Sequence, residues 1–133
     1  MNQETSRSEV VRYWWTKAQE CLDSAHREME SGSHGFAMNR IYYAAFYAVS
    51  AALLERQATF KKHSGVRAAF HHEFIRKSFL EIEWGKFYDQ LFEDRQEGDY
   101  LAMIEFDLEY VQDKLNRCKQ FLSLLKPMIP SPM

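Results

Sequence analysis

The chain has 133 residues, of which 46% are hydrophobic, 15% aromatic and 27% charged. A chain of this length forms one domain and buries about two-thirds of the surface of its unfolded state. The aromatic content excludes a disordered or low-complexity protein. Because the net charge is only −2, no overall positive field attracts nucleic acid, and a polyanion would need a local basic cluster.

Several classes of protein are excluded by missing motifs. The two cysteines, Cys21 and Cys118, lie far apart, so no Cys-x-x-Cys zinc site exists and a disulfide framework is not expected. The sequence contains no glycine-rich phosphate loop and no Glu-x-x-His pair for a di-iron site. The N-terminus lacks a signal-peptide pattern, and the longest uncharged stretch, residues 41–54, is shorter than the roughly 20 residues that cross a bilayer. We therefore expect a cytoplasmic protein with reduced cysteines that does not span a membrane and that uses no metal or cofactor.

The apolar pattern predicts helices from the start of the chain. Ser6 and Glu9 have the spacing of a capping box and predict a first helix over residues 7–31, ending at Ser31-Gly32-Ser33. Its apolar residues recur at steps of four and three, as one helical stripe does: Val10, Trp14, Ala18, Cys21, Ala25 and Met29.

A second helix is predicted over residues 34–56. Its stretch 41–54 has no polar face. A helix that is apolar all round is buried all round, so we expect this to be the central helix of the domain.

Two shorter helices follow a loop over residues 59–64. Thr59 or Ser64 is expected to cap a third helix that reaches about Lys77 and turns three residues inward: Val66, Phe70 and Phe74. A fourth helix is expected from about 80 to 96, burying Trp84, Phe87, Tyr88, Leu91 and Phe92. Both helices would cover the central one.

The last helix is predicted to begin after Gly98, with Asp99 as its N-cap. Its apolar residues alternate steps of four and three, which indicates packing against a core neighbour or a second chain: Ile104, Leu108, Val111, Leu115, Cys118, Leu122 and Leu125. Pro127 ends it, and residues 127–133 are expected to form a flexible tail. The fold class is therefore an all-α antiparallel bundle of about five helices, in one domain over residues 1–133 with a core over about 7–126.

Arg40 is the most informative polar residue. It follows Asn39 and precedes fourteen uncharged residues, and a guanidinium is costly to bury unless it is paired or lines a cavity. Tyr43 and Tyr47 project from the same helical face. Two interpretations stay open: a buried ion pair with a carboxylate of another helix, or a site where the guanidinium holds a phosphate beside aromatic rings.

Two further segments carry groups that could act on an anion. Arg95 and Asp99 flank the predicted break before the last helix, where they form a local ion pair and an N-cap; the alternative is that Asp99 is the carboxylate that orients Arg40. Lys61-Lys62-His63 is most simply a solvated loop. It is also the one place where a phosphate and a titrating imidazole could meet.

Three motifs, in this order, resemble the HEPN superfamily, and most of all its small stand-alone bacterial and archaeal members. They are Asn39-Arg40-Ile41-Tyr42-Tyr43-Ala44-Ala45-Phe46-Tyr47-Ala48, then His63-Ser64-Gly65-Val66 with Phe70, then Arg95 with Asp99-Tyr100. The resemblance covers about residues 9–125. It implies a helical bundle that pairs with a second copy around the second-helix motif and is often encoded beside a small nucleotidyltransferase. Active members of the family are metal-independent ribonucleases, many of them toxins.

The sequence departs from the signature of the active members, which is an Arg followed after four to six residues by a His. Arg40 matches the Arg and Asn39 the polar residue beside it, but Tyr47 stands where the His would be. Metal-free RNA cleavage needs a group of near-neutral pKa to move the 2′-OH proton. A Tyr, with a pKa of about 10, stays protonated at pH 7. The resemblance therefore assigns anion binding to Arg40 and no catalytic His to this helix.

Three hypotheses follow. The first is a homodimeric HEPN module with weak or lost catalysis, which partners a nucleotidyltransferase antitoxin and binds RNA or nucleotide phosphate in a dimer cleft. Its binding residues would be Asn39, Arg40, Tyr43, Lys61, Lys62 and His63, supported by Arg95, Asp99 and Tyr100. The second is an active ribonuclease toxin that uses Arg40 with His63 or Tyr47. The third is a structural interaction domain in which Arg40 and Asp99 form a buried ion pair.

Overall fold

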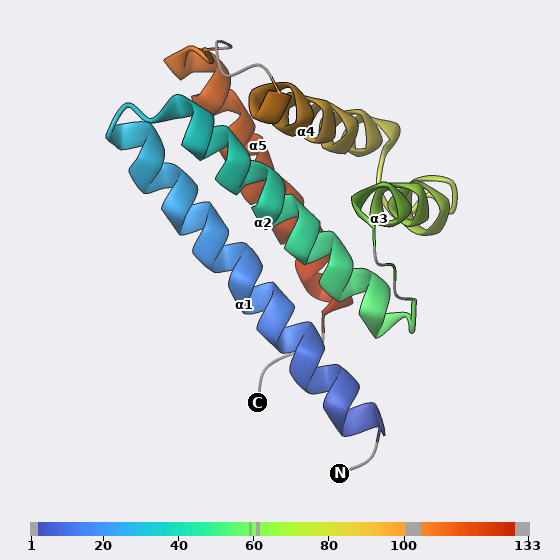
Figure 1. Cartoon of the computed structure of the whole chain (residues 1–133). Coiled ribbons are helices and arrows are strands. Elements are labelled where there is room, and N and C mark those ends of the chain that lie inside the picture. The colour runs from blue at the N-terminus through green and yellow to red at the C-terminus, as the bar shows by residue number, and fades with distance from the viewer. Residues whose placement is uncertain (1–2, 59, 61, 101–104, 130–133) are drawn as a thin grey trace.

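The computed structural model describes residues 3–58, 60, 62–100 and 105–129, and the side chains of residues 6–58, 60, 62–95 and 105–129. The elements, in chain order, are α1 (Gln3–Glu30), α2 (His34–Glu55), α3 (His63–Phe70), the π-helical turn η1 (His71–Ile75), α4 (Ile82–Tyr100), α5 (Leu108–Leu125) and the 3-10 turn η2 (Lys126–Met128). Helices α1 and α2 run antiparallel, side by side (Figure 1). All these elements are helical, which confirms the predicted all-α bundle.

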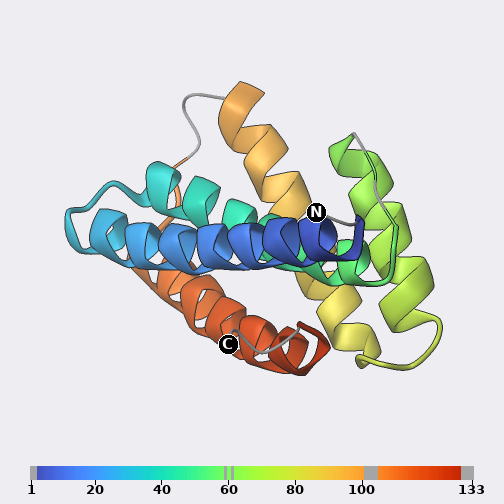
Figure 2. The same ribbon diagram turned by 90° about the horizontal axis from the view of Figure 1, so that it is seen from below.

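Helix α2 is the central helix, as predicted. It packs against α1, α3, α4 and α5, and its alanines let these neighbours approach closely (Figure 2). The expectation that it is buried all round is wrong along one stripe, because Tyr43 and Tyr47 are only half-buried, whereas Ile41, Tyr42 and the alanines of α2 are buried. We call the exposed or half-buried residues of this stripe, spaced by four, three and four, the open stripe: Phe36, Arg40, Tyr43 and Tyr47.

Helix α1 covers α2 with a stripe that differs from the predicted one at its first position. Val11 is fully buried, whereas Val10 is 39% exposed; two adjacent valines fit the period almost equally well. The remaining members of the stripe are buried or half-buried, as predicted. The helix begins at Gln3, before the predicted capping box, and ends where Gly32 takes a positive φ of 84°. Only glycine adopts that backbone without strain, so the predicted stop is confirmed.

The third predicted helix is interrupted by a π turn. Helix α3 ends at Phe70 and η1 follows, although Val66, Phe70 and Phe74 are buried as predicted. The N-cap of α3 is Lys62, not Ser64; Thr59 lies outside the described residues.

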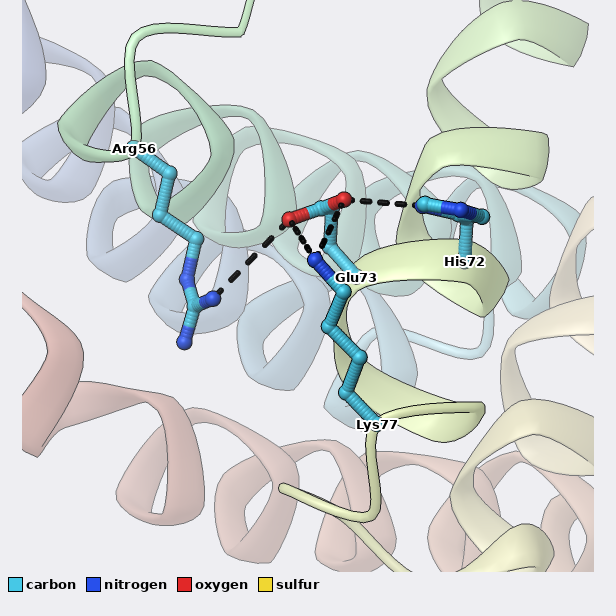
Figure 3. A network of polar contacts seen from close by, with 4 residues as sticks. All are labelled: Arg56, His72, Glu73 and Lys77. Carbon is cyan, nitrogen blue, oxygen red and sulfur yellow. Dashed lines mark hydrogen bonds and ion pairs between the residues drawn. The ribbon is translucent and has the colours of Figure 1, made fainter.

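Polar contacts fasten η1 to the end of α2 (Figure 3). The Glu73 carboxylate accepts a hydrogen bond from Lys77 Nζ at 3.1 Å, and its Oε2 lies 2.8 Å from His72 Nδ1. Its Oε1 lies 3.9 Å from Nη1 of Arg56, the C-cap residue of α2. The hydrogen bonds from His72 and Lys77 lower the pKa of Glu73. The guanidinium of Arg56 also stacks on the buried Phe74 of η1, so these contacts hold η1 against the end of α2.

The α4–α5 connection differs most from the prediction. Helix α4 continues through Gly98 to Tyr100, and Asp107, not Asp99, caps α5 by accepting from the Tyr110 backbone at 2.8 Å. A glycine inside a helix costs only about 1 kcal/mol, which the packing of α4 offsets. The core residues predicted for α4 are buried, and so is the α5 seam from Val111 to Leu125. Leu108 is exposed, and Ile104 lies outside the described residues.

The segment after α5 stays in contact with the core. Residues 126–128 form η2, and Ile129 is buried; residues 130–133 lie outside the described residues. None of the helices in the described ranges combines the length and the apolar character needed to cross a bilayer.

Candidate functional site

Arg40 is exposed on the open stripe. Its Nη1 donates to Asn39 Oδ1 at 3.4 Å, and no carboxylate among the described side chains lies within ion-pair distance. The expectation of a buried guanidinium is therefore wrong: the apolar run begins after Arg40, and the helical rotation turns Arg40 away from the core. Asp99, its predicted partner, has no described side chain.

The open stripe borders α1, which adds a second cation and another aromatic ring. The Lys17 ammonium lies 5.5 Å from the centroid of the exposed Tyr13 ring and within electrostatic reach of Tyr47. Burial raises the pKa of the Cys21 thiol in α1, and the positive charge of Arg40 opposes this shift. Cations beside exposed rings form a surface that can hold phosphates and stack bases.

His63 lies in a different place, against the adjoining face of α2. Its ring stacks on Phe46, with the centroids 4.3 Å apart and the planes 12° from parallel. Its Nδ1 shares a hydrogen bond with Tyr42 Oη at 2.8 Å. Tyr42 and Phe46 are one helical turn apart, so α2 presents them together to the first residue of α3.

Arg95 reaches the same cluster from α4. Its Nη2 donates to Tyr43 Oη at 3.0 Å, and its guanidinium lies 5.5 Å from the ring centroids of both Tyr42 and Tyr43. Sequence reasoning placed Arg95 beside Asp99, either in a local ion pair or in support of the anion site. The described contacts instead join Arg95 to α2, while the side chains of Asp99 and Tyr100 lie outside the described ones.

We call Tyr42, Tyr43, Phe46, His63 and Arg95 the His63 cluster. Burial, followed by the charge of Arg95, lowers the pKa of His63. Burial raises the pKa of Tyr42 to about 12. Both groups are therefore neutral at pH 7. In the tautomer whose Nδ1–H donates to Tyr42, the His63 Nε2 keeps a lone pair that can accept a proton.

The structure brings some predicted site residues together and separates others. Tyr43 belongs to both groups, with its ring 6.2 Å from Tyr47 and 5.8 Å from His63. Among the described side chains, no contact joins His63 to Arg40. Lys62 is exposed beside His63, and Lys61 lies outside the described residues. Where side chains are described, no three His, Cys, Asp or Glu residues converge on a metal position.

Sequence reasoning missed Tyr42 and Phe46 as the partners of His63. Their one-turn spacing on α2 was visible, but nothing in the sequence said which segment covers that face. It also missed the contact between Arg95 and Tyr43, which are 52 residues apart in the chain.

The HEPN domain family model matches residues 11–128. The chain belongs to the HEPN family. The resemblance drawn from the three motifs is thereby confirmed, over nearly the same range.

Three relatives of this HEPN protein cover between about half and nearly all of its length. A UPF0332 protein of Thermotoga maritima is 42% identical over 123 residues, covering 92% of this chain and 93% of the relative. "Putative toxin MJ0142" of Methanocaldococcus jannaschii is 37% identical over 113 residues, covering 80% of this chain and 77% of the relative. UPF0332 protein PH1297 of Pyrococcus horikoshii is 35% identical over 69 residues, covering 52% of this chain and 49% of the relative.

Proposed function

We propose that this HEPN protein binds the phosphates of RNA or of a nucleotide at the open stripe, in a cleft between two copies of the chain. The exposure of Arg40 without a carboxylate partner among the described side chains carries this proposal. A guanidinium whose donors are almost all free can form paired hydrogen bonds with phosphate oxygens. Asn39, which already accepts from Arg40, holds the fork in place.

The pairing of two copies is supported by the apolar character of the same surface. Phe36 is 67% exposed, and Tyr43 and Tyr47 are half-buried along the stripe. Covering such rings removes apolar surface from water, which stabilises a dimer by roughly 25 cal/mol per Å². Two Arg40 side chains would then face one cleft, and a bound phosphate would relieve their repulsion.

The other predicted residues would extend the anion site. Lys62 is exposed and Lys61 precedes it, so this loop can follow a bound strand beyond the cleft. His63 and Arg95 would support the rings of α2 from behind. The number of cations is small, so binding should depend on only a few phosphate contacts.

Catalysis is proposed to be weak or lost, because Tyr47 stands where active HEPN ribonucleases have His. We further propose that the protein is the HEPN half of a two-gene module with a nucleotidyltransferase antitoxin. Two relatives from Methanocaldococcus jannaschii carry names that describe them as toxins, which supports this context.

An active ribonuclease is the second candidate, and the His63 cluster favours it. The lowered pKa of His63 suits a general base at neutral pH, and Arg95 supplies positive charge nearby. In that reaction Nε2 takes the 2′-OH proton and the 2′-oxygen attacks phosphorus to form a 2′,3′-cyclic phosphate. The P–O5′ bond breaks as the 5′-oxygen takes a proton from water. Cleavage of a labelled RNA by the wild type, lost in His63→Gln and kept in His26→Gln, would select this candidate over the first.

Two measurements on the purified protein test the main proposal. Sedimentation should give a dimer. Fluorescence anisotropy should detect binding of a single-stranded RNA oligonucleotide, and the slope of log K against log salt should correspond to about two to four phosphates, at roughly −0.7 for each. A monomer at all concentrations, or no RNA binding at low salt, would contradict the proposal.

A further inference from the structure

A second group of cations lies between α4 and α5, and none of its residues belongs to the open stripe or the His63 cluster. These residues line an open pocket of about 290 Å³. Helix α4 contributes Glu83, Lys86, Phe87 and Gln90, and α5 contributes Lys114 and Arg117.

Lys114 is the unusual member of this pocket, because only 8% of its surface is exposed. Its ammonium lies 5.0 Å from the centroid of the Tyr110 ring, and no carboxylate among the described side chains is within ion-pair distance. An ammonium on a side chain with so little access to water is costly to keep without an anionic partner. Since the chain keeps this charge at the wall of a pocket, a bound anion would offset that cost.

The buried carboxylate between these two helices is already engaged. Asp94 accepts from Gln90 Nε2 at 2.9 Å through one oxygen and from Tyr110 Oη through the other. Burial and the hydrogen bond to Asp94 raise the pKa of Tyr110, so its proton stays in place. The Asp94 network therefore fixes the wall of the pocket and leaves the Lys114 ammonium without an ion pair.

The remaining cations add to the imbalance. The Arg117 guanidinium stacks on Trp84 and Phe87, at 5.6 and 5.1 Å from their centroids, which limits the directions in which its donors point. Lys86 is exposed at the rim, and neither cation pairs with a described carboxylate. Three cations, Lys86, Lys114 and Arg117, against the carboxylates of Glu83 and Asp94 leave a local charge of +1, in a chain whose net charge is −2.

We propose that this pocket binds a phosphate monoester group, such as the terminal phosphate of a nucleotide or of an RNA 5′ end. Such a group carries a charge of about −1.5 to −2 at pH 7 and three acceptor oxygens. The Lys114 ammonium, the Arg117 fork and the second N–H of the Gln90 amide supply donors of matching kind. This site is independent of the function proposed for the open stripe.

Calorimetric titration of the full chain with inorganic phosphate and with AMP tests the site. Because the open stripe is itself proposed to bind nucleotide phosphates, the comparison is made in Arg40→Ala, which should bind one ligand per chain. Adding Lys114→Met, which keeps the length of the side chain and removes the charge, should weaken binding by about tenfold or more, since a charge-assisted contact is lost. Adding Lys119→Met is the matched control on the exposed face of α5 and should leave the binding of Arg40→Ala unchanged.

The source of the phosphate is distinguished by RNA oligonucleotides with and without a 5′-phosphate, titrated into Arg40→Ala so that the open stripe does not contribute. Tighter binding of the 5′-phosphorylated strand, lost in the Arg40→Ala/Lys114→Met double variant, assigns the site to RNA ends. If AMP binds and the two RNA strands bind with equal affinity, the site is assigned to free nucleotides.

Removal of a buried unpaired charge should not unfold the protein. Without ligand, Lys114→Met is expected to raise the melting temperature by a few °C. If it unfolds, Lys86→Gln at the exposed rim is the second variant and should weaken phosphate binding severalfold. Absence of phosphate and AMP binding in the wild type overturns the proposal. Equal phosphate affinity in Lys114→Met and Lys119→Met also overturns it. If Lys114→Met is unfolded, unchanged phosphate affinity in Lys86→Gln overturns it.

Discussion

Two pairs of aromatic residues in α2, Tyr42 with Phe46 and Tyr43 with Tyr47, lie on two surfaces with different properties. Tyr42 is fully buried and packs with the half-buried Phe46 in the His63 cluster, whereas their immediate neighbours Tyr43 and Tyr47 lie on the open stripe. Consecutive residues on a helix point about 100° apart, so a repeated pair of rings faces both the core and the outside. The rings of Tyr42 and Phe46 can bury a neighbouring group and so shift its pKa, whereas the rings of Tyr43 and Tyr47 can contact a ligand or a second copy of the chain.

The largest difference between the two surfaces should appear in stability. Tyr42→Ala removes a ring that contacts Tyr43, Phe46, His63, Tyr88 and Phe92, and should lower the free energy of unfolding by about 3–5 kcal/mol. Tyr47→Ala, on the open stripe, should cost about 1 kcal/mol. Urea unfolding of the two variants measures both, and equal losses would show that the division of the rings is wrong.

A smaller effect should isolate the hydrogen bond inside the His63 cluster. Tyr42→Phe keeps the ring and removes the partner of His63 Nδ1, so it should cost about 1 kcal/mol. Tyr43→Phe removes the acceptor of Arg95 at the edge of the open stripe and should cost less, because solvent can replace it there. A larger loss in Tyr43→Phe than in Tyr42→Phe would contradict this order.

The two surfaces should also differ in their dependence on pH. The folded state disfavours protonated His63, because burial and Arg95 lower its pKa. Below about pH 6.5, His63 therefore binds more protons in the unfolded chain than in the folded chain. The free energy of unfolding falls with pH for this reason, until the pH has fallen through the folded-state pKa of His63.

Unfolding of the wild type and His63→Gln between pH 7.5 and 5 measures this effect. The wild type should lose more stability than the variant over this range. Arg95→Met should reduce the difference in part, because burial is the larger cause of the shift and stays in place. A wild type that gains stability relative to His63→Gln on acidification would contradict the assignment.

The parts of the fold that follow from apolar periodicity were predicted from the sequence. The position of α2, the inward face at Val66, Phe70 and Phe74, and the α5 seam from Val111 depend on local patterns that burial enforces directly. Helix boundaries were less predictable, because Asp99 and Asp107 are both good caps. In the structure α4 continues through Gly98 to Tyr100, and Asp107 is the residue that caps α5.

The site was less predictable than the fold, because its residues meet through tertiary contacts. The motif around Arg40 was recognised, but its exposure depends on which face of α2 the other helices leave open. His63 was singled out for its neighbours Lys61 and Lys62, whereas its contacts are with rings 17 and 21 residues earlier in the chain. Lys114 gave no signal, since a lysine next to Leu115 looks like an ordinary solvent-facing position.

Arg40→Ala, measured for stability and for RNA affinity in the same preparation, tests the central claim most directly. Arg40 is exposed and makes no ion pair with a described carboxylate, so the free energy of unfolding should stay within about 0.5 kcal/mol of the wild type. The affinity for single-stranded RNA should fall about tenfold or more, whereas Arg76→Ala, an exposed arginine after η1, should leave it unchanged. Unchanged RNA affinity in Arg40→Ala, or an equal loss in Arg76→Ala, would contradict the claim that the open stripe holds the phosphate.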